Sequence, residues 1–80
     1  NEDTRVRTNK RKAEILHVED DQEFVQLVSK SLQDFAHILN ATSIQSAKTF
    51  LGSRTFDLVI LDLMLPDGYG TELIDLINKK

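Results

Sequence analysis

Apolar residues in this chain fall into short continuous runs separated by longer segments with helical spacing. The runs predict three strands, at residues 14–18, 36–41 and 56–61. Continuous apolar runs of this length are typical of strands covered on both faces, as in parallel sheets.

The segments between and after these runs predict three helices. In the first, over residues 22–34, apolar residues at helical spacing form one stripe and either Asp20 or Asp21 caps the helix. In the second, Ser43 is the predicted cap and Gly52 the predicted end. The third begins near Thr71, after a turn-rich loop at residues 65–70. The residues predicted to face the core are, in chain order, Phe24, Leu27, Val28, Leu32 and Phe35; Ile44, Ala47, Phe50 and Leu51; and Leu73, Ile74, Leu76 and Ile77.

Strands that alternate with helices predict right-handed crossovers and an α/β fold with a doubly wound parallel sheet, here β-α-β-α-β-α. The length of 80 residues allows one small domain. We expect residues 1–12 to form a basic leader or linker and residues 13–80 to form the domain.

Two of the predicted strands end in acidic residues. Glu19 and Asp20 follow the first strand, and Asp62 follows the third. Open parallel sheets bind ligands beyond the carboxyl ends of their strands. If these two strands are neighbours, the three carboxylates share a pocket, and each close pair repels by about 4 kcal/mol at an effective dielectric of about 20. The pattern therefore predicts a hard divalent cation, Mg2+, bound by oxygen ligands.

Composition narrows the function further. The chain has no cysteine, which excludes disulfides and thiolate metal sites and fits a cytoplasmic protein. No apolar run approaches the length of about 20 residues that spans a bilayer, so no membrane partner is predicted. The net charge of −3 divides into +3 over residues 1–12 and −6 over the rest. An acidic body argues against nucleic acid as a ligand of the domain itself.

Two segments carry a resemblance to a known family. Residues 15–21 read ILHVEDD and residues 57–70 read DLVILDLMLPDGYG. In this order and spacing they resemble the receiver domain of two-component response regulators. The resemblance covers residues 14–80 and implies a flavodoxin-like sheet of strand order 2-1-3-4-5, with the first and third strands adjacent.

The resemblance also implies roles for individual residues. Asp62 matches the phosphoacceptor, whose carboxylate attacks a phosphohistidine donor to form an acyl phosphate. Asp20 matches a direct ligand of Mg2+, Glu19 a ligand through water, and Met64 a ligand through its backbone carbonyl. The implied partner is a histidine kinase or a phosphotransfer protein, and the implied function is phosphorelay signalling, with no catalysis beyond self-phosphorylation and self-dephosphorylation.

The chain departs from the family after its third helix. Receivers continue with a fourth strand ending in Ser or Thr and a fifth ending in Lys, and both contact the phosphoryl group. We expect impaired phosphorylation and no switching unless these parts come from elsewhere. Two interpretations stay open: a chain that associates through the exposed edge of its third strand as a homodimer or higher oligomer, and a piece of a longer protein.

Two other functions compete with the phosphoacceptor. One is a receiver-like interaction module that takes no phosphate. The other is a metal-dependent phosphohydrolase of the haloacid dehalogenase type, which is disfavoured because that family has a second aspartate where this chain has Met64. We predict that His17 is a packed or partly exposed strand residue, His37 a surface strand residue, Tyr69 a loop residue and Asp67 a turn residue.

Overall fold

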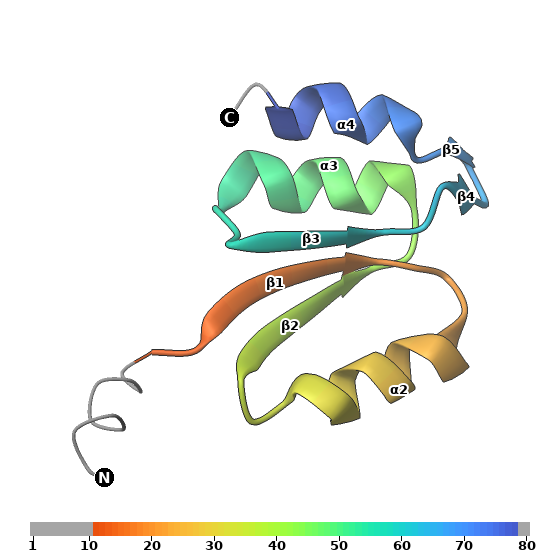
Figure 1. Ribbon diagram of the computed structural model, residues 1–80. Helices are drawn as coiled ribbons and strands as arrows, with labels where there is room; N and C mark the ends of the chain where they lie inside the picture. The colour runs from red at the N-terminus through yellow and green to blue at the C-terminus, as the bar shows by residue number, and fades with distance from the viewer. Residues whose placement is uncertain (1–10, 79–80) are drawn as a thin grey trace, which may run out of the picture.

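The computed structural model describes residues 11–78, and the predicted basic leader lies mostly outside these residues. The elements form one α/β unit with helices on both sides of a sheet (Figure 1). In chain order they are β1 (Ala13–Val18), α2 (Gln22–Leu32), β2 (Ala36–Ala41), α3 (Ile44–Ser53), β3 (Leu58–Leu61), β4 (Met64–Leu65), β5 (Gly68–Tyr69) and α4 (Thr71–Asn78).

The main sheet has three parallel strands in the order β2-β1-β3. Its register pairs Val18 of β1 with Ala41 of β2 on one side and with Leu61 of β3 on the other. The prediction that the first and third strands are neighbours is therefore confirmed. Because all three strands run the same way, the residues that follow them emerge at one edge of the sheet.

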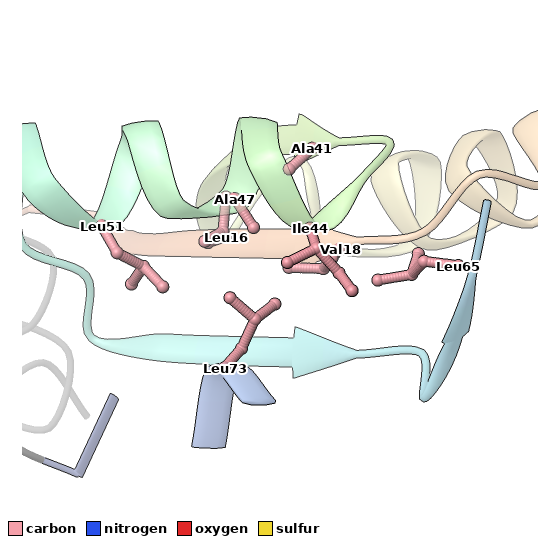
Figure 2. Packing of buried hydrophobic residues seen from close by; sticks show 8 residues of the cluster. All are labelled: Leu16, Val18, Ala41, Ile44, Ala47, Leu51, Leu65 and Leu73. Atoms are coloured by element: carbon pink, nitrogen blue, oxygen red, sulfur yellow. The ribbon is translucent and has the colours of Figure 1, made fainter. Parts of the chain in front are cut away.

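The two faces of the sheet carry different helices. Helices α3 and α4 lie on one face and α2 lies on the other (Figure 1). Apolar side chains from β1, β2, α3, β4 and α4 interdigitate on the first face (Figure 2). This core consists of Leu16, Val18, Ala41, Ile44, Ala47, Leu51, Leu65 and Leu73.

The prediction that the apolar stripe of the first helix faces the core is wrong for several of its residues. Val25, outside that stripe, is the buried residue of α2, whereas Phe24 is 43% exposed, Leu27 61% and Phe35 70%. The buried Val25 and the half-buried Val28 and Leu32 lie on a face rotated from the predicted stripe, because the orientation of a helix is set by the element on which it packs. Among the described residues, α2 alone covers this side of the sheet.

Several predicted boundaries shift for local reasons. Helix α3 continues past Gly52 to Ser53, and the Arg54 N–H donates to the Phe50 carbonyl at 3.1 Å. Strand β3 begins at Leu58 rather than at residue 56, and just before it the Asp57 carboxylate accepts the Glu14 N–H at 2.7 Å.

The predicted loop at residues 65–70 contains part of a small antiparallel hairpin. Met64 pairs with Tyr69, and Leu65 pairs with Gly68. Gly68 has a φ of 143°, a backbone region that other residues rarely adopt. In the helix that follows, Leu73 is fully buried, but Ile74 is 42% exposed, so the prediction that Ile74 faces the core is wrong.

Candidate metal and phosphoacceptor site

The acidic residues are fixed by ladder hydrogen bonds that continue one residue beyond each strand. The Glu19 N–H donates to the Ala41 carbonyl at 2.9 Å, and the Asp62 N–H donates to the Val18 carbonyl at 2.9 Å. Both acidic residues therefore have a main chain held by the sheet, while their side chains lie past its carboxyl edge.

The side chains of Glu19, Asp20 and Asp62 come together at this edge. Each offers a carboxylate oxygen, and the three oxygens lie within 4.8 Å of one another. Asp20 is exposed and Asp62 is half-buried, so the cluster is open to solvent. The predicted meeting of these three residues is confirmed, and its three hard oxygen donors fit a Mg2+ ion.

No cationic side chain neutralises this cluster within residues 11–78. The ion pairs of that stretch join Arg11 to Asp57 at 3.7 Å, His37 to Glu14 at 2.9 Å and Lys48 to Glu72 at 3.0 Å. Among the described residues, the repulsion between the three carboxylates is therefore not offset by an ion pair.

Asp21 has a different task from its two acidic neighbours. Its carboxylate caps α2 by accepting the Glu23 N–H at 3.1 Å, and its own N–H donates to Glu19 Oε2 at 3.2 Å. Of the two alternatives for the cap, Asp20 or Asp21, the structure therefore selects Asp21. This leaves Asp20 free for the acidic cluster.

Met64 follows the site at the start of β4. Its N–H donates to Asp62 Oδ1 at 3.2 Å, and the whole residue is 69% exposed. The hydrogen bond keeps the main chain of Met64 next to the Asp62 carboxylate. Ligation of a metal by the Met64 carbonyl stays a prediction.

The return of the chain to α4 requires glycine at position 70. A Cβ there would lie 2.6 Å from the Asp62 carbonyl oxygen and 2.9 Å from Leu61 Cδ1. The Gly70 N–H also donates to the Leu63 carbonyl at 2.8 Å. The start of α4 therefore packs directly on the backbone of the candidate phosphoacceptor.

Asp67 fixes the tip of the hairpin to α3. Its carboxylate accepts the N–H groups of Ile44 at 2.8 Å and Gln45 at 3.1 Å. These hydrogen bonds, the one from Ile44 first, lower the pKa of Asp67. The sequence interpretation of Asp67 as a turn residue missed this role, since the partner helix begins 23 positions earlier.

His17 and Tyr69, which the sequence predicted to be a strand residue and a loop residue, lie in β1 and in the short strand β5. His17 is 1% exposed and packs its ring edge-on against Phe24, with 5.6 Å between ring centroids. Burial lowers the pKa of His17 and favours its neutral form. Tyr69, in β5, is 66% exposed.

Asn40 was missed as a contributor to the site. It lies in the strand predicted at residues 36–41 and was given no role, although a polar residue in an apolar strand is a signal to look for polar partners. In the structure its side-chain amide donates to backbone carbonyls at the exit of β1.

No helix among the described residues has the length and apolar character needed to cross a membrane. A comparison with curated proteins found no match. The family model of the response regulator receiver domain matches residues 15–80.

Solved structures of receiver domains are similar to this chain. The non-phosphorylated HemR receiver domain from Leptospira biflexa is 41% identical with a TM-score of 0.79, and the match covers 86% of this chain and 56% of that one. The signal receiver domain of a putative LuxO repressor protein from Vibrio parahaemolyticus is 30% identical with a TM-score of 0.79, over 86% of this chain and 54% of that one.

The BeF3-activated receiver domain of DrrB, a Thermotoga maritima protein, is 28% identical with a TM-score of 0.77, over 86% of this chain and 57% of that one. The chain thus spans just over half of the length of these receiver domains. The three-stranded parallel sheet with its helices is consistent with the family that the model match identifies. The chain belongs to the response regulator receiver domain family.

Proposed function

We propose that this signalling domain accepts a phosphoryl group on Asp62 from a phosphohistidine of a histidine kinase or phosphotransfer protein. A carboxylate oxygen of Asp62 forms the new bond to phosphorus, and the bond from phosphorus to the imidazole nitrogen of the donor breaks. The observation that supports this proposal is the meeting of three carboxylates within 4.8 Å at the carboxyl edge of a receiver-type sheet.

The same proposal assigns the metal ligands. Asp20, Asp62 and the Met64 carbonyl would hold Mg2+ directly, and Glu19 would do so through water. When bound, Mg2+ supplies positive charge that neutralises the carboxylates and the incoming phosphoryl oxygens. The protein contributes the positions of these groups, because the main chain of Glu19 and of Asp62 is held by the sheet. We place this reaction in the cytoplasm.

Residues 13–80 form the receiver portion in this proposal, and residues 1–12 form a basic leader or linker. A Ser or Thr and a Lys, which receivers carry at the ends of later strands, would complete the phosphoryl site from outside residues 13–80. Without them we expect residues 13–80 to bind Mg2+ but to be phosphorylated slowly.

The test is phosphorylation by labelled acetyl phosphate in the presence of Mg2+. Wild-type protein is expected to take up label and Asp62→Asn to take up none, whereas removal of Mg2+ with a chelator abolishes labelling. Asp57→Asn is the matched control, because Asp57 lies at the opposite end of β3 and pairs with Arg11. Equal labelling of wild type and Asp62→Asn would refute the proposal.

Within residues 11–78 no strand pairs with the outer edge of β3, and we propose another copy of this chain as a second partner at this edge. Alongside this edge lies a mainly apolar hollow of about 360 Å³, whose lining includes Leu58, Val59 and Ile77. An unpaired strand edge next to apolar surface is a template for strand addition. Sedimentation is expected to show a dimer that Leu58→Lys converts to monomer, since Leu58 is 52% exposed. A compact wild-type monomer at micromolar concentration would exclude this association.

A further inference from the structure

We infer that Asn40 is a positioning residue for the acidic cluster, because its side-chain amide fixes the backbone at the point where β1 ends. The inference rests on the proposed function, because the backbone that Asn40 holds carries Glu19 and Asp20, two of the proposed metal ligands. Asn40 itself is not one of the three carboxylates of the cluster.

The Asn40 amide nitrogen lies near three backbone carbonyl groups, two of which flank the end of β1. Its Nδ2 lies 3.0 Å from the His17 carbonyl and 3.0 Å from the Glu19 carbonyl. It also lies 3.3 Å from the carbonyl of Ala41. Carbonyl oxygens can only accept, so the amide nitrogen and not its oxygen must face this group. The two nearer carbonyls lie on either side of Val18, the last residue of β1.

The other end of the amide is also held. Gln22 Nε2 donates to Asn40 Oδ1 at 3.3 Å. Gln22 is the first residue of α2, which begins directly after the acidic segment. Asn40 therefore connects the end of β2 to the exit of β1 and to the start of α2. The segment from Glu19 to Asp21 is fixed at both of its ends.

The acidic segment needs such a clamp for a physical reason. Carboxylates within 4.8 Å of one another repel when no cation is present. The last ladder bond of β1 toward β2 is the one from the Glu19 N–H to the Ala41 carbonyl. Magnesium tolerates little departure from octahedral geometry with ligands at about 2.0–2.1 Å. The Asn40 amide holds the backbone at the Glu19 carbonyl, which lies beyond that last ladder bond. This contact keeps the carboxylates close to their binding positions before the ion arrives.

The experiment compares two substitutions on the same strand. Asn40→Leu keeps the approximate size of the side chain and removes all of its hydrogen bonds. His37→Leu is the matched control, because His37 pairs with Glu14 at the opposite end of the β1–β2 ladder, at 2.9 Å. Both variants lose one side-chain link between the strands, but only Asn40→Leu loses it next to the acidic cluster. Asn40→Gln retains an amide and serves as the conservative variant.

Calorimetric titration with MgCl2 gives the first result. We expect Asn40→Leu to weaken Mg2+ binding by about 10-fold, the lower end of the loss seen when a residue that orients a metal ligand is removed. Asn40→Gln should recover part of the affinity, and His37→Leu should bind as wild type does. Unchanged binding by Asn40→Leu, or an equal loss in His37→Leu, would overturn the inference.

Amide hydrogen exchange gives a result that does not depend on Mg2+. In metal-free Asn40→Leu the N–H groups of Glu19 and Asp21 are expected to exchange faster than in wild type, while that of Asp57, bonded to the Glu14 carbonyl, does not change. If wild type binds no Mg2+, the proposed metal site fails, and exchange alone then decides whether Asn40 is a clamp. Unchanged exchange at Glu19 would show that it is not.

Discussion

The two faces of the sheet differ in how completely they are covered. On the face of α3 and α4, eight apolar residues form a continuous buried cluster (Figure 2). On the face of α2, Leu27 is 61% exposed, and neither ring nitrogen of the buried His17 has a hydrogen-bond partner among residues 11–78. Helix α2 has five apolar residues among its eleven, so a lack of apolar side chains does not explain the difference.

The difference shows where the stability of this stretch of chain originates. Burial of apolar side chains is the main favourable term in folding, and here it is concentrated on the α3–α4 face. That face also holds the Asp67 and Gly70 contacts that fix the hairpin after Asp62. The α2 face contributes chiefly the cap at Asp21 and the Asn40 clamp. The acidic site is thus supported by packing from one side and by hydrogen bonds from the other.

The sharpest test of this comparison truncates the same residue type on each face. Leu73→Ala removes a side chain with no exposure from the core, and we expect it to lower the free energy of unfolding by about 3 kcal/mol. Leu27→Ala on α2 is expected to cost less than about 1 kcal/mol. Urea unfolding followed by circular dichroism measures both, and Leu73→Val keeps the comparison measurable if Leu73→Ala does not fold. Equal losses on the two faces would show that α2 is as well packed as α3 and α4.

A pair of glycines tests how tightly the packed face closes on the acidic site. Gly70→Ala forces a Cβ to within 2.6 Å of the Asp62 carbonyl, and we expect a loss of about 1–3 kcal/mol together with weaker Mg2+ binding. Gly52→Ala, in α3, meets nothing within 4 Å and is expected to stabilise by about 0.5–1 kcal/mol. Thermal unfolding and Mg2+ titration of both variants are the measurements. A Gly70→Ala protein with native stability and affinity would contradict the close packing.

The smallest effect concerns His17 on the open face. Burial lowers its pKa in the folded state, so below the unfolded value of about 6.5 the unfolded chain takes up the proton first. Stability is therefore greatest above that pH and falls as the pH drops through it toward the folded value. His17→Leu is expected to stabilise by about 1 kcal/mol at pH 7.5 and to flatten this decline. The measurement is the urea unfolding midpoint between pH 7.5 and 5.5, with His37→Gln as the control variant. If the midpoint of His17→Leu fell with pH as steeply as that of wild type, the prediction would be contradicted.

Local patterns in the sequence predicted much of this molecule. Short apolar runs indicated β1, β2 and β3, and Ser43 was correctly predicted to cap α3. These features depend on residues close together in the chain, which is why sequence reasoning reaches them. The acidic cluster was also predicted, because parallel strands place the residues after them at one edge. The roles of its residues in binding and phosphorylation stay predictions.

Tertiary structure alone decided the remaining features. The exposure of α2 depends on what covers its outer side, and the roles of Asn40 and Asp67 depend on backbone groups about twenty positions away. Spacing along the chain cannot reveal such partners, since hydrogen bonds require atoms to come within about 3 Å in space. Local sequence patterns were enough to predict which acids lie at the sheet edge, whereas the residues that hold them there became known only from the folded chain.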